Sequence, residues 1–258
     1  MTNTLRSSVA NQQPQELQPV HQVETSGHAS EINLAQWIAD NTTWVSDHLA
    51  TDGALVLRGL NINTPQRLDA LARHYPGDNF PYLQSLSNAL RVNLTERVFT
   101  ANEAPAYRSI DLHHEMAQTP FYPDVVMFAC ELAATSGGST TVCDSVQLYQ
   151  LLKQQMPDFI NQCHQLGVRY RQRFAYYADT ESAQGRGWPH LLNLPTTLRK
   201  TPSSAHLYQL KPLAEQKLNQ LNYDFCWHPD QSLEITTPVL PAVKQPKHST
   251  QKTELAFF

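Results

Sequence analysis

Short strand-like segments, rather than long apolar runs, dominate the middle of this chain of 258 residues. Apolar and β-branched residues gather there in brief runs bounded by Gly, Pro, Asn and Asp, which is typical of strands. Four segments fit this pattern: residues 92–100, 110–116, 125–132 and 140–143. Many short strands with helices on one side predict an α+β protein, a distorted double-stranded β-helix (jelly roll) with helical insertions. A generic α+β fold is the alternative that periodicity leaves open.

Helix signals precede these segments. Apolar residues recur at helical spacing over residues 34–49, and Gly53 ends the run. Residues 54–59 then predict a short buried strand. Thr64-Pro65 opens a further helix, because threonine is a good capping residue and proline is favoured in the first turn.

The second half of the chain predicts further elements in the order helix, helix, strand, helix and hairpin. These are residues 146–155, a helix that opens at Met156-Pro157, residues 166–174, residues 213–221, and the strand pair 223–227 and 233–237.

Domain organisation follows from where periodic patterning begins. Residues 1–30 are rich in Gln, Ser, Thr and Asn and show no sustained period, so they predict a flexible N-terminal leader. Residues 31–258 contain no internal repeat and no convincing linker, which predicts a single domain. The apolar residues 254–258 stand where chain ends are usually polar, so we expect a core strand cut short and a domain without its last core strands.

Composition narrows the class of protein. No stretch approaches the roughly 20 apolar residues of a membrane span, and no apolar secretory segment stands at the N-terminus, so we expect a cytoplasmic protein with no membrane partner. Four cysteines without a CxxC pair suit a reducing compartment. A net charge of −4 without a basic cluster argues against nucleic acid as a partner. The oligomeric state is left open.

The triplet His113-His114-Glu115 carries the strongest chemical signal. On an extended strand, residues i and i+2 project to the same face, so His113 and Glu115 can hold one metal ion while His114 points away. Two histidines and one carboxylate on one face of an iron, with open positions, form the facial triad of non-haem Fe(II) oxygenases. The triplet supplies two of these three ligands.

A triplet of this kind is weak evidence alone. With 11 histidines and 23 acidic residues, roughly one match arises by chance, and the chain contains two. The second, His228-Pro229-Asp230, has proline between its candidate ligands and lies in a predicted turn, which favours turn chemistry. Arg169, Arg171 and Arg173 alternate along one predicted strand, and a solvated or salt-bridged face is the preferred interpretation.

Several motifs in register strengthen the first triplet. Residues 52–60, Leu112-His113-His114-Glu115-Met116, Gly137-Gly138-Ser139-Thr140-Thr141 and Asp144-Ser145 follow one another in this order. This order resembles the TauD/TfdA-like (taurine dioxygenase) family of Fe(II)/2-oxoglutarate oxygenases, and most of all its SyrP-like branch. The resemblance covers most of residues 45–258. It implies a jelly roll, Fe(II), 2-oxoglutarate as co-substrate, and hydroxylation of a small amino-acid-like or natural-product substrate, free or tethered to a carrier protein.

The resemblance also implies roles for single residues. His113 and Glu115 match the proximal histidine and the carboxylate of the iron site, and Thr140 matches the threonine whose hydroxyl helps to bind the 2-oxoglutarate carboxylate. His114 replaces the family's usual Asn, and Ser139 replaces a Glu, but neither position is a ligand. In the family, the distal histidine and the arginine that binds 2-oxoglutarate lie beyond a strand that corresponds to residues 254–258.

Two hypotheses about function therefore stand. The first is an Fe(II)/2-oxoglutarate-dependent hydroxylase. The second is a truncated, catalytically inactive relative, or a binding remnant, that lacks the distal histidine and the arginine. A small-molecule-binding β-domain without metal is a third possibility. Because two protein ligands hold iron less firmly than three, we expect weak metal binding and no 2-oxoglutarate turnover from this chain.

Overall fold

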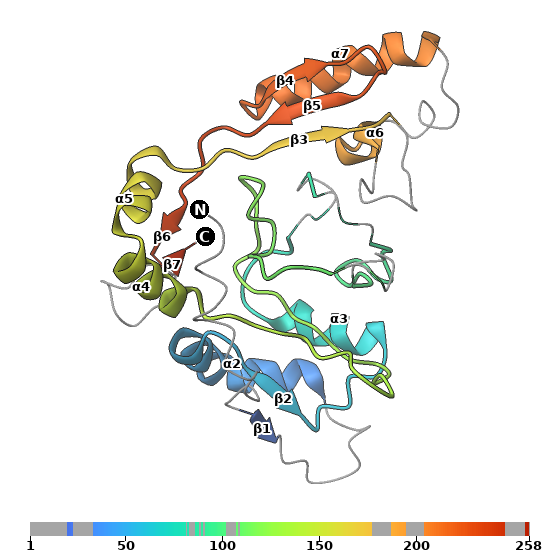
Figure 1. Ribbon diagram of the computed structural model, residues 1–258. Helices are drawn as coiled ribbons and strands as arrows, with labels where there is room; N and C mark the ends of the chain where they lie inside the picture. Colours follow the sequence, from blue (N-terminus) through green and yellow to red (C-terminus); the bar gives the residue numbers. More distant parts are fainter. Residues whose placement is uncertain are drawn as a thin grey trace.

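The fold is described from a computed structural model of the chain. The structure describes residues 20–22, 33–80, 82, 86–87, 89, 91–101, 107, 109–176, 187–194, 204–245 and 256–257. Helices and short strands form three groups joined by irregular segments (Figure 1). Within these residues, no helix is both long and apolar enough to cross a bilayer.

The first group contains the two helices predicted near the N-terminus. Helix α2 spans Leu34–Asp52 and helix α3 spans Pro65–His74. Helix α2 ends at Gly53, whose φ of 73° is a left-handed conformation that glycine adopts without steric strain. The Thr64 hydroxyl accepts a hydrogen bond from the Arg67 amide at 3.3 Å and so caps α3. Both predicted helices and their end signals are confirmed.

Strand β2 (Val56–Arg58) lies between these helices in the sequence and is shorter than the predicted 54–59. It is also less buried than predicted, because Arg58 is exposed and its two neighbours are only half-buried. It pairs in parallel with β1 (Val20–Gln22), which lies inside the segment expected to be a flexible leader. The rest of that leader lies outside the described residues, so the predicted domain boundary stays a prediction.

A hydrophobic core joins the elements of this first group. Its buried members come from α2, from α3 and from the loop after β2. They are Leu34, Ile38, Val45, Leu60 and Leu71. The apolar residues that recur at helical spacing in α2 therefore lie on the face that packs in this core, as the periodicity predicted.

The second group holds two helices and a two-stranded sheet. Helix α4 (Ser145–Gln155) begins where the Asp144 carboxylate accepts hydrogen bonds from two backbone amides, at 2.8 and 3.2 Å. Helix α5 (Pro157–Leu166) follows directly, so both predictions are confirmed. Strands β6 (Val243–Lys244) and β7 (Ala256–Phe257) pair antiparallel beside α4 (Figure 1).

The third group is a three-stranded antiparallel sheet covered by a helix. Its strands are β3 (Arg171–Phe174), β5 (Leu233–Thr236) and β4 (Asp224–Trp227), in the order β3-β5-β4. Strands β4 and β5 form the predicted hairpin. The short helix α6 (Trp188–Leu191) follows β3 along the chain.

Helix α7 (Ser204–Gln220) lies along one face of this sheet (Figure 1). It begins before the predicted 213–221 and contains Pro212, which is usually restricted to the first helical turn. Its fully buried Leu210, Ala214 and Leu218 pack in one core with Leu233 and Ile235 of β5. This burial accounts for a helix that continues through an unfavourable residue.

The middle of the chain departs from the prediction. Residues 110–116, 125–132 and 140–143 form no strand, and within 92–100 there is only an isolated bridge between Asn93 and Phe99. A strand needs a partner for its backbone groups and one buried face, whereas residues 128–144 are all exposed. The predicted mixture of helices and strands is confirmed. The described sheets have two, three and two strands, so the jelly roll stays an expectation from the family.

The central strand of the sheet offers a direct test of this packing. Replacing fully buried Leu233 by alanine removes side-chain contacts with the core and leaves a cavity. We expect Leu233→Ala to lower the free energy of unfolding by about 2–5 kcal/mol, measured by urea denaturation. The control Leu132→Ala changes a side chain that is 91% exposed and should change the free energy of unfolding by no more than about 0.5 kcal/mol. Equal effects of the two variants would contradict the assigned core.

Candidate metal centre

His113 and Glu115 lie close together, although not on a strand. Residues 111–114 are irregular, and a turn begins at Glu115. His113 Nε2 lies 4.0 Å from Glu115 Oε2, while the His113 side chain is 56% exposed and that of Glu115 is 27% exposed. The i, i+2 spacing therefore predicted the pair correctly, but the strand invoked for it is wrong. A local bend brings the two side chains together instead.

Met116 anchors that bend. Its side chain is buried, and its φ of 61° is unusual for a residue other than glycine. The amide of Thr119 donates to the Met116 carbonyl at 3.0 Å and closes a turn. The Thr119 side chain is also buried. The segment is thus pinned directly after the His113–Glu115 pair, which limits where Glu115 can point.

The ring of His113 is oriented by the backbone. Its Nδ1 lies 2.6 Å from the carbonyl oxygen of Asp111, and only a protonated Nδ1 can donate to that oxygen. In the neutral ring, Nε2 then carries the lone pair and faces Glu115. A backbone carbonyl that fixes the tautomer in this way is the usual support of a metal-binding histidine.

Glu115 has a cationic partner as well. Arg91 Nη2 donates to Glu115 Oε1 at 2.7 Å, and the Arg91 side chain is only 16% exposed. Arg91 in turn donates from Nε to the hydroxyl of Tyr82 at 3.1 Å. One carboxylate oxygen of Glu115 is therefore engaged by Arg91, and the other faces His113.

The donor set fits a divalent transition metal in part. A neutral imidazole nitrogen and a carboxylate oxygen are ligands that iron accepts. A lone pair and a carboxylate that face each other repel unless a cation or a proton lies between them. Among the described residues, no third His, Cys, Asp or Glu side chain completes a group with this pair. His113 and Glu115 would thus hold the ion as two neighbouring ligands.

Thr140 lies in the exposed segment 128–144 and forms no hydrogen bond with another residue that the structure describes. Before it, Gly137 and Gly138 have φ values of 68° and 75°. A Cβ on Gly138 would lie 2.8 Å from that of Ala134, so the glycine pair is required by the local backbone. Among the described residues, no hydrogen bond links Thr140 to His113 or Glu115, and its role stays a prediction.

Comparison with known proteins decides the family. Residues 16–217 match the taurine catabolism dioxygenase TauD, TfdA family. The chain belongs to this family. The resemblance seen in the motifs is confirmed at the family level, whereas the short strands predicted at 110–116, 125–132 and 140–143 are not formed.

Two curated relatives are similar to this TauD/TfdA family member over part of their lengths. A clavaminate synthase-like protein of Arabidopsis thaliana is 29% identical over 219 residues, which are 85% of this chain and 62% of that protein. The dapdiamide synthesis protein DdaC of Enterobacter agglomerans is 27% identical over 130 residues, or 50% of this chain and 38% of that protein. The matches thus span about three fifths and two fifths of the two relatives.

The second triplet, His228-Pro229-Asp230, forms a turn rather than a metal site. The amide of Gln231 donates to the His228 carbonyl, and the His228 amide donates to the Ser232 carbonyl, each at 3.0 Å. Asp230 accepts from the Ser232 hydroxyl at 2.6 Å and from its amide at 3.1 Å. These contacts close the hairpin between β4 and β5, so the interpretation as turn chemistry is confirmed.

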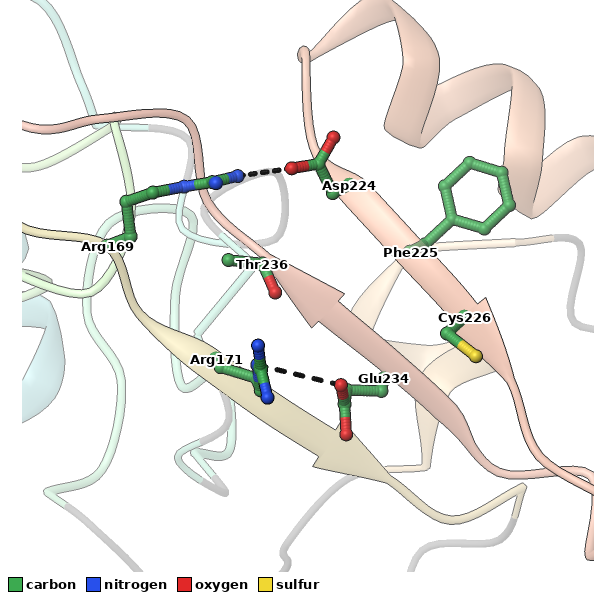
Figure 2. A pocket seen from close by; sticks show the side chains of 7 residues that line it. All are labelled: Arg169, Arg171, Asp224, Phe225, Cys226, Glu234 and Thr236. Atoms are coloured by element: carbon green, nitrogen blue, oxygen red, sulfur yellow. Dashed lines mark hydrogen bonds and ion pairs between the residues drawn. The ribbon is translucent and has the colours of Figure 1, made fainter.

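The three alternating arginines form a salt-bridged face, as the sequence favoured. Figure 2 shows Arg169 directed at Asp224 of β4, and Arg171 directed at Glu234 of β5. Arg173 pairs with Asp230 at 2.8 Å. An open groove of about 230 Å³ lies on this face, which is opposite to the apolar face that packs on α7. Because each guanidinium has an acidic partner, the groove has little net charge to attract a carboxylate.

Sequence reasoning missed Arg91. It lies 24 residues before Glu115, and no local spacing links an arginine to a carboxylate at that distance. In the sequence, Arg91 directly precedes the predicted strand 92–100. No signal in this one sequence could have singled it out from the other arginines.

The hairpin turn predicts a pH dependence of stability. Hydrogen bonds from Ser232, with the nearby Arg173 guanidinium, hold the pKa of Asp230 at about 2. An unfolded aspartate titrates near about 3.9, so the contribution of Asp230 is present above that pH and is lost as the pH falls through about 2. We expect the stability difference between the wild type and Asp230→Asn, measured by urea denaturation, to shrink between about pH 5 and about pH 2.

Ser232→Ala removes the main cause of this lowered pKa and should flatten the same pH dependence. Parallel curves of stability against pH for the wild type and Asp230→Asn would contradict the assignment.

Proposed function

We propose that this protein is an Fe(II)/2-oxoglutarate-dependent oxygenase that hydroxylates a small, amino-acid-like or natural-product substrate, free or tethered to a carrier protein. Membership of the TauD/TfdA dioxygenase family supports the class of reaction. The names of both relatives, a clavaminate synthase-like protein and a dapdiamide synthesis protein, favour a substrate of this kind.

The observation that carries the proposal is the geometry of His113 and Glu115. The Nε2 of the histidine and a carboxylate oxygen face each other at 4.0 Å, and the opposite ring nitrogen is fixed by a backbone carbonyl. When two ligand atoms bind one metal ion at a right angle and each lies about 2.1 Å from the ion, the two atoms are about 3 Å apart. A small rotation of the exposed His113 side chain closes that difference.

Each residue has a separate task in this proposal. Fe(II), when bound, supplies the oxidising chemistry of the family. His113 and Glu115 hold it, and the hydroxyl of Thr140 helps to bind the carboxylate of 2-oxoglutarate. The bond from His113 Nδ1 to Asp111 keeps the ring from rotating away. The distal histidine and the arginine for 2-oxoglutarate are not assigned to any described residue.

A second candidate function is metal binding without turnover, by a catalytically inactive relative or binding remnant. The donor set motivates it, because the pair stands without a third clustered ligand in the part of the chain that the structure describes. Both candidates share the His113–Glu115 pair, so metal binding tests their common basis and turnover separates them.

Calorimetric titration with Co(II), a redox-stable substitute for Fe(II), tests the common basis. We expect binding to the wild-type chain that weakens more than about tenfold in His113→Ala and in Glu115→Ala, since each removes a direct ligand. His114→Asn is the matched control, because it changes the middle residue of the triplet to the one usual in the family. It should bind Co(II) as the wild type does.

Equal Co(II) affinity in the wild type and in His113→Ala would refute the metal site and favour a β-domain that binds small molecules without metal. Once metal binding is established, succinate release from 2-oxoglutarate under O₂ separates the two candidates. Succinate that requires iron and disappears in His113→Ala supports the oxygenase. Metal binding without succinate supports the inactive relative.

A further inference from the structure

We propose that Arg91 is a positioning residue that sets the orientation of Glu115 for metal binding. The proposal rests on the proposed function, because it assumes that Glu115 is a metal ligand. Arg91 Nη2 holds Glu115 Oε1 at 2.7 Å and leaves Oε2 directed at His113. The carboxylate would thereby present one oxygen, rather than two, to the ion.

Burial distinguishes this ion pair from the others that the structure describes. The Arg91 side chain is 16% exposed and that of Glu115 is 27% exposed, whereas every other Arg–carboxylate pair has a partner that is more than half exposed. Exposed pairs are screened by water and hold their side chains weakly. A charge-assisted hydrogen bond is stronger than a neutral one, and a partly buried pair is screened less by water, so Arg91 can restrict the rotamer of Glu115.

Arg91 is itself held from the other side. Its Nε donates to the Tyr82 hydroxyl at 3.1 Å, and its Cζ lies 5.4 Å from the centre of the Tyr82 ring. Tyr82 is buried, and its ring lies 5.0 Å from that of Phe99. The same hydroxyl lies 3.1 Å from both Ser87 Oγ and the Ala89 carbonyl. A chain of contacts thus runs from a packed aromatic ring through Arg91 to Glu115.

Position, rather than charge, is the useful contribution of Arg91. A guanidinium near the ion repels it and lowers the electron density on the carboxylate, and both effects weaken metal binding. Arg91 therefore helps only if it keeps Glu115 in the orientation that meets His113. Tyr82→Phe loosens Arg91 without removing its charge. If Arg91 acts through its position, this variant should also weaken metal binding. A purely electrostatic or purely structural role of Arg91 would leave the metal affinity unchanged.

The test compares Co(II) affinity and the visible absorption band of bound Co(II) in four variants of the full chain. Arg91→Ala should weaken binding about 10- to 100-fold, the range typical for residues that orient a ligand. Arg91→Lys should recover part of the loss, since it keeps a donor but not the planar fork. Tyr82→Phe should weaken binding several-fold and change the band while Arg91 keeps its charge. Arg171→Ala, on the exposed face of β3, is the control and should match the wild type.

Each outcome has a separate meaning. If Co(II) binding is lost in His113→Ala but unchanged in Arg91→Ala and Tyr82→Phe, the proposal for Arg91 is overturned while the proposed function stands. If wild-type Co(II) binding does not depend on His113, both fail. Thermal unfolding is recorded for every variant. If Arg91→Ala does not fold, Arg91→Lys and Tyr82→Phe decide, and wild-type affinity in both overturns the proposal.

Discussion

Burial of apolar surface in two separate cores determines which parts of this chain have regular structure. One core joins α2, α3 and the loop after β2, and the other joins α7 to the sheet β3-β5-β4. The segment with the candidate metal centre, green in Figure 1, runs between them with little burial of its own. It is therefore positioned by a few specific contacts, namely the buried Met116 and the pair Arg91–Glu115. The geometry of the site depends on these contacts rather than on a strand.

This division explains which elements could be predicted from the sequence. Helices carry their signals locally: Gly53 supplies a left-handed end, and Thr64 and Asp144 accept bonds from the first turns of α3 and α4. The hairpin β4–β5 is also local, because Asp230 closes its own turn. The strands predicted at 110–116 and 125–132 fail because a strand depends on a distant partner, and no pattern within the segment shows whether that partner is present.

The site follows the same rule. The pairing of His113 with Glu115 could be predicted because only His114 lies between them, so a short, fixed length of backbone joins them. The alternation of Arg169, Arg171 and Arg173 correctly predicted a shared face, although not which acidic residues of β4, β5 and the turn between them would pair with them. Arg91 could not be predicted, since its contact with Glu115 depends on the tertiary fold. The role of Thr140 rests on the family alone.

We propose that His113 and Glu115 bind one metal ion, with His113 as a ligand through Nε2. Proton NMR of the Co(II)-loaded chain tests it most directly, because a paramagnetic ion strongly shifts protons on the residues that ligate it. If His113 binds through Nε2, its Nδ1 proton, held by the Asp111 carbonyl, gives a far-shifted signal that exchanges with solvent deuterium. We expect this signal to be present in the wild type and in His114→Asn and to be missing in His113→Ala. A shifted signal that persists in His113→Ala, or no such signal in a wild type saturated with Co(II), would contradict it.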